Sequence, residues 1–538
     1  MACRVRVSDG LGGVLTMATE RSDRPLRAAR ALQPARVIVS DRAQPEAAPR
    51  GRRFLVVDLN NFASFPTLAV GLLVASLRNR GHRVDVLCPL AHDVPATERE
   101  RRETLVDHVR RRIHLSDWRP FLGVRDLLRR AETVRVERTH PIVLREIAKA
   151  LDLRPDAVLI SAYLQHFNSA EAIAALAKTR GIPVIIGGPM FNIAEVADTW
   201  RRIPGVAAIV GAEVDRELPD LMESLCGDGN PLAYPGVVMP DGRKSVAAAP
   251  LRNLDDTPVP DFTDFPWDRY AGRIVPMMTG RGCQWDKCRF CSDVISVSGR
   301  TFRTRSVENV LLEMQEQARR HQTSNFLFLD LKLNSWPDMI RGIARGIGRY
   351  VQGAEWIGTV HVDQRPDNGL SRADLEAAVD GGMRRVSFGL ESGSQRLLDL
   401  MHKGTSVPRN STFIKDAHAA GLSVRCTMFK GFPGETAADM DATVRFLDEH
   451  APYLDRVRFN EFTIHTGTPI WQAITDKAAA EAVLNVTRRD DRRARVHYRR
   501  AEDRGREYRR AKAQALDIVY RINSRQLRDT ARQFDGLM

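Results

Sequence analysis

Short apolar runs alternate with amphipathic segments through residues 53–226. The apolar runs are rich in Val, Ile and Leu and end at polar residues or glycine, which is the pattern of buried strands. The predicted strands cover residues 54–58, 83–87, 157–161, 183–186 and 206–210, and the predicted helices cover 68–80, 168–180 and 214–225. This alternation predicts an α/β, Rossmann-like domain with a doubly wound parallel sheet. Charged and largely helical sequence at 92–150 interrupts the alternation, and the pattern assigns it no role.

A second alternation of strands and helices runs from residue 272 to 475. The predicted strands lie near residues 274–279, 325–330, 356–361, 384–390, 422–430 and 457–464. Helices are predicted between them, for example over 306–320 and 371–380. Six β/α units of this kind predict a partial (β/α)6 barrel, with its active site at the carboxyl ends of the strands.

The remaining segments have other patterns. Residues 1–52 are rich in Ala, Arg and Pro without a sustained period, which predicts a disordered extension. Residues 227–271 contain seven prolines and are interpreted as a linker. Residues 476–538 are interpreted as a helical C-terminal cap, because apolar residues recur there at helical spacing opposite arginines. These apolar residues are Tyr508, Ala511, Ala515, Ile518, Val519 and Ile522.

The net charge of +14 lies almost entirely at the two ends of the chain. Residues 1–53 carry +6 and residues 481–538 carry +7, which leaves +1 for everything between them. A nearly neutral central body argues against a basic nucleic-acid groove. No apolar run reaches the roughly 20 residues of a membrane span, and the start of the chain lacks the apolar stretch of a secretory signal. We therefore expect neither a nucleic-acid nor a membrane partner.

Three of the seven cysteines fall close together, at Cys283, Cys288 and Cys291. Their spacing, C-x4-C-x2-C, follows an apolar run at 274–278 that is predicted to be a strand. Three thiolates at the end of a strand can hold three irons of a cubane cluster, which leaves the fourth iron open for a ligand. The alternative is a structural zinc site, which needs four ligands, and no further Cys or His pair lies nearby in the sequence. An oxygen-sensitive cluster suits a reducing cytoplasm, where we expect the protein.

These cysteines, with Phe290 directly before the last one, resemble the signature of radical S-adenosylmethionine (SAM) enzymes. The commonest form has three residues between the first two cysteines, and the four found here resemble a variant among cobalamin-binding members. Motifs at the later strand ends occur in the order of that family. The resemblance implies a [4Fe-4S] cluster held by the three cysteines, and SAM. The SAM contacts that it implies are Phe290, Asp330, Arg365, Glu391, Ser392, Gly431 and Pro433. His361, His465 and Glu461 are candidate substrate contacts, although ordinary core and surface roles are the preferred interpretation.

Residues 53–226 resemble the cobalamin-binding domain that precedes the radical SAM domain in one subfamily. The matching residues lie at predicted strand ends, namely Ser161, Gly187, Gly188, Pro189 and Gly211. The Asp-x-His-x-x-Gly segment that supplies a lower axial histidine in other cobalamin proteins is absent, so the resemblance implies cobalamin bound without that ligand. The alternative is a Rossmann-like domain that binds a nucleotide or nothing, and the glycine-rich dinucleotide fingerprint is missing.

The resemblance implies a cobalamin-dependent radical SAM methyltransferase. Its expected reaction is methylation of an unactivated carbon of a small molecule or natural-product intermediate, through a 5′-deoxyadenosyl radical and methylcobalamin. Rearrangement or cyclisation without net methylation, and methylation of a phosphinate phosphorus, stay open. A cobalamin-binding regulator with a degenerate barrel would have damaged cluster or SAM motifs, and here they are intact. A transfer-RNA methylthiotransferase would need a second cysteine triad in the first domain, and the cysteines there are too scattered for one. The expected partners are a small-molecule substrate and an electron donor such as flavodoxin or ferredoxin.

Overall fold

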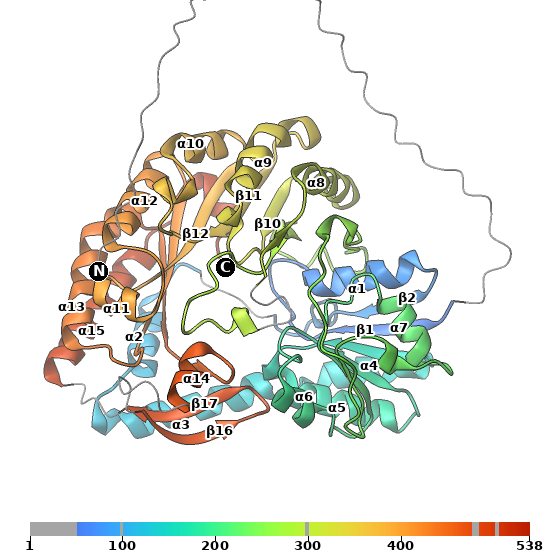
Figure 1. The fold of residues 1–538 in the computed structure, drawn as a ribbon. Helices are drawn as coiled ribbons and strands as arrows, with labels where there is room; N and C mark the ends of the chain where they lie inside the picture. The colour runs from blue at the N-terminus through green and yellow to red at the C-terminus, as the bar shows by residue number, and fades with distance from the viewer. Residues whose placement is uncertain (1–50, 97–100, 296–300, 476–483, 501–504, 538) are drawn as a thin grey trace, which may run out of the picture. The chain divides into compact units, whose positions relative to one another are not determined.

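Two parallel sheets, one in each half of the chain, organise the structure (Figure 1). The structure is a computed structural model, and it describes residues 51–96, 101–295, 301–475, 484–500 and 505–537. The extension predicted over residues 1–52 therefore lies almost entirely outside the described residues. No helix in the described ranges is both long and apolar enough to cross a membrane.

The first sheet has the strand order β2-β1-β3-β4-β5-β6. Its parallel strands are β1 (Arg53–Asp58), β2 (Arg83–Leu87), β3 (Ala157–Ser161), β4 (Val184–Gly187) and β5 (Val206–Val210). All five agree with the predicted strands. The order reverses between β1 and β3, and ligands of doubly wound sheets bind outside the carboxyl ends of the strands at such a point.

Helices cover both faces of this sheet because its strands bury both sets of side chains (Figure 1). Along β1, Phe54 and Val56 pack in one core with α1 (Leu68–Asn79) and α7 (Leu218–Leu225). The alternate residues Leu55 and Val57 pack in a second core. That second core includes α4 (Pro141–Asp152), α5 (Phe167–Lys178) and α6 (Ala194–Trp200). Helix α7 begins at Leu218 rather than at the predicted residue 214, because Pro219 suits a first helical turn and Asp215 pairs elsewhere.

The second sheet has the order β14-β13-β12-β11-β10-β7, with neighbouring strands parallel throughout. Its strands are β7 (Val275–Met277), β10 (Asn325–Phe328), β11 (Glu355–Val360), β12 (Met383–Glu391), β13 (Ser423–Lys430) and β14 (Arg456–Glu461). Five helices cover its outer side (Figure 1). They are α8 (Val307–His321), α9 (Pro337–Tyr350), α10 (Arg372–Asp380), α12 (Val407–Ala419) and α13 (Ala437–His450). The predicted β/α alternation is confirmed, and no pairing among the described strands closes β14 onto β7.

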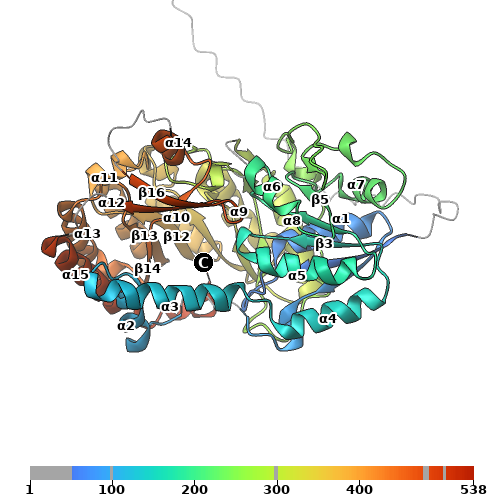
Figure 2. The ribbon, with the colours of Figure 1, turned by 90° about the horizontal axis from the view of Figure 1, so that it is seen from below.

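The charged segment at 92–150 spans the two halves of the chain. Its helices are α2 (Leu105–His114), α3 (Arg119–Glu137) and α4. Figure 2 shows α3 running from the barrel strand β14 toward α5. Arg129 of α3 pairs with Glu461 at the end of β14 at 2.6 Å. Asp117, directly before α3, pairs with Lys430 at the end of β13 at 2.9 Å. This segment therefore covers the carboxyl ends of the last two barrel strands.

The predicted linker at 227–271 is partly structured. Residues Val237–Val238 form β6, which pairs antiparallel with β5 and extends the first sheet. These two residues of the predicted linker therefore extend the first sheet. The proline-rich remainder crosses toward α8, where Gln317 donates a hydrogen bond to the carbonyl of Pro260 at 2.8 Å.

The prediction of an all-helical C-terminal region is wrong for residues 484–500. Strands β16 (Leu484–Asp490) and β17 (Arg495–Arg500) form an antiparallel hairpin, and β17 also pairs with β15 (Ile464–His465). Val496 packs with Phe462 and Ile464, so tertiary contacts stabilise strand alternation in an arginine-rich sequence.

The helix predicted from the apolar spacing is confirmed as α15 (Arg506–Asn523), with all six of those residues buried. It covers the edge of β14. The Asn523 side chain accepts a hydrogen bond from Val457 N at 2.8 Å and donates one to Val457 O at 2.9 Å. One amide thus takes the place of a neighbouring strand at this point of the edge.

Candidate functional site

The three clustered cysteines lie in a loop that leaves the first barrel strand. After β7 the chain forms the short strand β8 (Gly280–Arg281), which pairs with β9 (Arg303–Thr304). Asp330, just beyond the end of β10, fixes this connection. Its carboxylate accepts hydrogen bonds from Thr279 Oγ1 at 2.7 Å and Gly280 N at 2.8 Å. Burial raises the pKa of Asp330 to about 6. Asp330 therefore binds the protein's own backbone next to the site, which is a different contact from the predicted one with SAM.

The three cysteine thiols differ in how far they are buried. Cys288 is buried, and Cys283 and Cys291 are half-buried. Within the described residues, no three Cys, His, Asp or Glu side chains converge to hold one metal ion. A cubane cluster takes three cysteines on three separate irons. Burial raises the pKa of the Cys288 thiol to about 11, while the positive charge of Lys403 acts in the opposite direction. The donor set is thus three thiols with a cation beside them, which suits an anionic iron–sulfur cluster.

Glu391 and Ser392 lie at the carboxyl end of β12, beside this loop. Glu391 has a left-handed backbone with φ +59°, which is uncommon outside glycine, and its carboxylate is paired with Lys403 at 2.9 Å. Ser392 Oγ lies 3.1 Å from Thr443 Oγ1 of α13. Strand β12 and helix α13 therefore place the predicted SAM residues at the carboxyl edge of the second sheet, near Cys288.

Arg365 belongs to a buried ion-pair network at the end of β11. Asp363 accepts hydrogen bonds from Lys332 Nζ at 2.7 Å and from Arg365 Nη2 at 2.7 Å. Burial acts to raise the pKa of Asp363, but the hydrogen bonds from Arg365 and Lys332 lower it to about 2. Arg365 also donates to the carbonyl of Asn334 at 2.7 Å. Sequence reasoning missed Lys332 and Asp363, although Lys332 lies only two residues after Asp330.

Gly431 and Pro433 follow β13 in a turn that α15 stabilises. The Glu435 carboxylate accepts a hydrogen bond from Gly431 N and another, at 2.9 Å, from the hydroxyl of Tyr508. The C-terminal helix therefore contacts a segment predicted to lie beside SAM. The spacing in the sequence indicated that Tyr508 is buried, but not what it contacts.

The predicted cobalamin residues share one edge of the first sheet. Ser161 and Gly187 are paired in register, and Gly211 follows the neighbouring strand β5. A Cβ on Gly188 would lie 2.2 Å from Ala162 O, and one on Gly211 would lie 2.5 Å from Phe191 O. Close packing of the strand-end loops on one another therefore already requires these two glycines. This packing explains the two glycines without a ligand at the edge.

The same edge contacts both flanks of the cysteine loop. On the flank before Cys283, Arg281 forms a buried ion pair with Asp215, in the loop after β5. On the flank after Cys291, the carbonyl of Ile295 accepts a hydrogen bond from the Asn192 side chain, in the loop after β4, at 2.8 Å. A ligand bound at the carboxyl ends of β4 and β5 therefore lies beside the cysteine loop.

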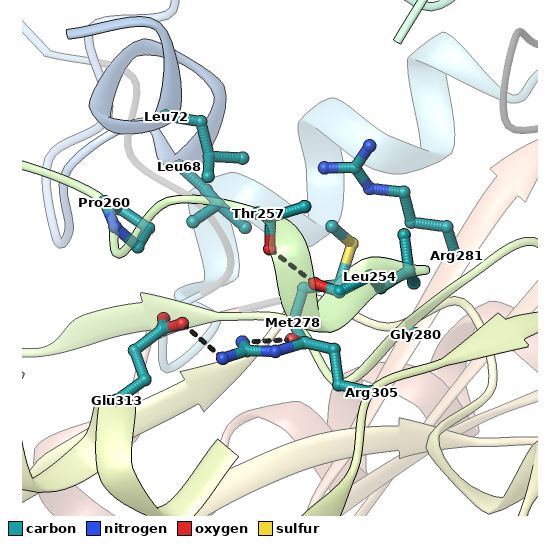
Figure 3. Close-up of a pocket in the computed structure, with 10 residues that line it drawn as sticks. All are labelled: Leu68, Leu72, Leu254, Thr257, Pro260, Met278, Gly280, Arg281, Arg305 and Glu313. Carbon is teal, nitrogen blue, oxygen red and sulfur yellow. Dashed lines mark hydrogen bonds and ion pairs between the residues drawn. The ribbon is translucent and has the colours of Figure 1, made fainter. Parts of the chain in front are cut away.

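A cavity with apolar and charged side chains in its walls borders the start of the cysteine loop (Figure 3). Leu68 and Leu72 of α1 lie across it from the ion pair of Arg305 and Glu313, whose atoms are 2.7 Å apart. Of the predicted site residues, the cavity includes none. Gly280 and Arg281 line it, so it borders only the start of the cysteine loop.

Two of the three secondary candidates, His361 and Glu461, have structural partners, and the third is buried. The ring of buried His361 lies against Trp285, and its Nε2 is 3.0 Å from Lys403 O. Glu461 pairs with Arg129 and Lys430. His465 lies in β15, and burial lowers its pKa to about 4. These contacts support the preferred core and surface roles.

Comparison with known proteins places this site in a family context. Residues 277–447 match the family model of the radical SAM superfamily. The chain is 28% identical over 338 residues to an uncharacterized methyltransferase of Pyrococcus horikoshii, an alignment that covers 61% of this chain and 70% of that protein. It is 23% identical over 344 residues to the anaerobic magnesium-protoporphyrin IX monomethyl ester cyclase of Rubrivivax gelatinosus, covering 61% of this chain and 60% of that protein.

Two solved structures have a similar fold. One is the radical SAM methyltransferase TsrM from Kitasatospora setae with cobalamin and a [4Fe-4S] cluster bound, with TM-score 0.58, 16% identity, and coverage of 83% of this chain and 84% of that one. The other is the cobalamin-dependent SAM radical enzyme OxsB with aqua-cobalamin and SAM bound, with TM-score 0.62, 15% identity, and coverage of 86% of this chain and 66% of that one. At these identities the likeness establishes a shared fold.

Proposed function

Because the chain carries a radical SAM domain over residues 277–447, we propose that it is a cobalamin-dependent radical SAM enzyme that methylates an unactivated carbon of a small molecule. The observation that carries this proposal is the pair of contacts between the first sheet and the cysteine loop. Arg281 with Asp215, and Asn192 with Ile295, bring the carboxyl edge of that sheet against both sides of the loop. A methyl transfer that uses a radical needs both cofactors near one substrate. The contacts between the first sheet and the cysteine loop would bring the two cofactor sites close together.

In the proposed mechanism, the barrel residues hold and orient the reactants. Cys283, Cys288 and Cys291 would hold the cluster and would leave one iron open to bind SAM. Glu391 and Ser392, fixed by β12 and α13, orient the rest of SAM. When bound, the cluster supplies the electron that cleaves SAM, and the corrinoid supplies a methyl group. Helix α3 and the Asp117 loop cover the strand ends beside Lys430 and Glu461, which limits access of water to reactive species.

The first sheet supplies the proposed corrinoid edge. Ser161, Gly187, Gly188, Pro189 and Gly211 are the residues proposed to lie against the cofactor. Their position beside the cysteine loop supports this assignment. A corrinoid would be held there without the Asp-x-His-x-x-Gly segment, which is absent from the chain.

The substrate is proposed only as a class. A structure of TsrM has been solved with its tryptophan substrate and a SAM analogue bound, which fits a small-molecule substrate for this chain as well. The electron donor is proposed to be a flavodoxin or ferredoxin.

The decisive experiment is an anaerobic turnover with methyl-labelled SAM, a chemical reductant and candidate small molecules. We expect one S-adenosylhomocysteine and one 5′-deoxyadenosine for each labelled product, because one SAM methylates the corrinoid and another gives the radical. A second candidate function, cyclisation or rearrangement without methylation, is favoured by the identity to the magnesium-protoporphyrin ester cyclase. Formation of 5′-deoxyadenosine and product without label would establish that alternative and remove the methyltransferase proposal.

A further inference from the structure

The turn after α11 (Gln395–Leu400) is fitted closely against the cysteine loop. We call residues 400–404 the clamp turn. The carbonyl of Met401 accepts a hydrogen bond from Arg289 N at 3.0 Å, and the carbonyl of His402 accepts one from the Trp285 indole at 2.9 Å. Gly404 has φ +68°, and a Cβ there would lie 2.0 Å from Trp285 Cζ2. The clamp turn therefore determines the position of the loop that carries the three thiols.

The clamp turn also delivers one buried cation to that loop. The Lys403 side chain is 8% exposed and its Nζ lies 2.9 Å from Glu391 Oε1. The same Nζ lies 5.7 Å from the centre of the Phe290 ring. Phe290 lies between Cys288 and Cys291 in the sequence. Burial acts to lower the pKa of Lys403, but Glu391 and the Cys288 thiol together raise it. Lys403 therefore keeps its positive charge in a largely buried position.

A charge in this position acts strongly on its neighbours. Coulomb interactions gain strength when water is excluded, whereas solvent screens an exposed charge. Lys287, in the same loop, offers the comparison. It is exposed and its Nζ lies 5.4 Å from the centre of the Trp285 ring. The two lysines differ in burial. Of the two, only Lys403 lies between a carboxylate, that of Glu391, and the cysteine loop.

We propose that Lys403 is a positioning residue whose ammonium stabilises negative charge on the cluster loop and so raises the reduction potential of the cluster. Glu391 neutralises part of this charge in the absence of SAM. When SAM engages Glu391, Lys403 acts more fully on the cluster, so SAM binding makes the cluster easier to reduce. This second step rests on the proposed role of Glu391, whereas the first step needs only the cluster.

The test is an anaerobic redox titration of the reconstituted protein, followed by electron paramagnetic resonance with and without SAM. We expect Lys403→Met to give a more negative midpoint potential and a smaller shift on SAM addition, and Lys403→Arg to restore both. Glu391→Gln should move the SAM-free potential in the opposite direction, because it removes the neutralising carboxylate. Lys287→Met, the exposed control, should leave the potential close to that of the wild type.

Two results would overturn the proposal. One is a Lys403→Met protein with full iron content and an unchanged potential. The other is a Lys403→Met protein that only loses SAM affinity, which would make Lys403 a SAM contact. If Lys403→Met fails to bind iron, Glu391→Gln still decides the question, since an unchanged or more negative potential contradicts the proposal. The titration requires no turnover, so absence of methyl transfer would leave its outcome unaffected.

Discussion

Arg281 and Asp215 form a bidentate ion pair that joins the two halves of the chain. Arg281 Nη1 lies 2.7 Å from Asp215 Oδ2, and Nη2 lies 2.6 Å from Oδ1. Both side chains are 8% exposed. Arg281 lies two residues before Cys283, and Asp215 lies four residues after Gly211. The pair therefore connects the proposed corrinoid edge directly to the cysteine loop.

Replacing one member of this ion pair should lower the free energy of unfolding. Asp215→Asn removes the bidentate partner of the buried Arg281 and leaves only Glu213, whose Oε2 lies 3.6 Å from Arg281 Nη1. Removing one member of a buried pair typically costs about 3–5 kcal/mol. We expect a loss of this size in the free energy of unfolding of the metal-free protein, measured with guanidinium chloride. The double variant Arg281→Met with Asp215→Leu should lose less than the sum of the two single changes.

The neighbouring Arg216–Asp256 pair is the matched control. Its atoms are 2.9 Å apart, but the side chains are 56% and 42% exposed. Arg216→Met should therefore cost about 1 kcal/mol or less. Equal losses for Arg216→Met and Asp215→Asn would contradict the structural role given to the buried pair.

The three loop cysteines should be equally necessary for iron binding. Cys283→Ala, Cys288→Ala and Cys291→Ala should each abolish the cluster absorbance and SAM cleavage, because each removes the ligand of one iron. Cys426→Ala should keep the cluster, because that residue lies in β13 at 0% exposure, away from the loop. Iron and sulfide analysis after anaerobic reconstitution checks this. A full cluster in the Cys288→Ala protein would be incompatible with the assignment.

Gly404→Ala should displace the cysteine loop. A Cβ at this position meets the Trp285 ring at 2.0 Å, so the ring or the clamp turn must move. We expect reduced iron content and a change in Trp285 fluorescence. Gly353→Ala is the control, since Gly353 has φ +65° and nothing within 4 Å of its Cβ position. It shares the backbone strain of a left-handed alanine without the clash. Equal iron loss in both variants would show that strain alone is responsible.

Asp330 should make the stability of the protein depend on pH in a defined direction. Burial raises its pKa from 3.8 to about 6, so the folded protein binds the proton more tightly than the unfolded chain does. Its contribution to stability is therefore present below pH 4 and is lost as the pH rises through 6. Over that window of roughly two units, the free energy of unfolding of the wild type should fall by up to about 3 kcal/mol relative to Asp330→Asn.

Unfolding of the metal-free protein between pH 4 and pH 7 measures this difference. Asp58 in the first domain, whose pKa burial also raises to about 6, titrates over the same range in both proteins and cancels from the comparison. Asp58→Asn should show a difference of the same sign. Parallel profiles for the wild type and Asp330→Asn would contradict the burial argument.

The sequence predicted the strands because buried parallel strands require continuous apolar runs, as in Phe54–Val57 and Phe326–Phe328. It also predicted which residues lie at the strand ends. It did not predict which side chains contact one another at those ends. The contact of Asp330 with Thr279 and the ion pair of Lys403 with Glu391 depend on how the loops pack, which the sequence pattern does not specify. The hairpin was missed because Val496 and Tyr498 alternate among arginines, and the surface that buries them comes from Phe462 and Ile464.

The side chain of Asn523 has a consequence for how the barrel reaches its final state during synthesis. Until α15 has left the ribosome, Val457 on β14 presents an unpaired N–H and C=O, and exposed strand edges of this kind recruit other chains. The strands of the second sheet precede α15 in the chain, so they are synthesised first. The edge of β14 therefore stays exposed until α15 has been made. Truncation before Asn523 should therefore yield aggregated chains, even though every cluster and SAM residue proposed above would be present.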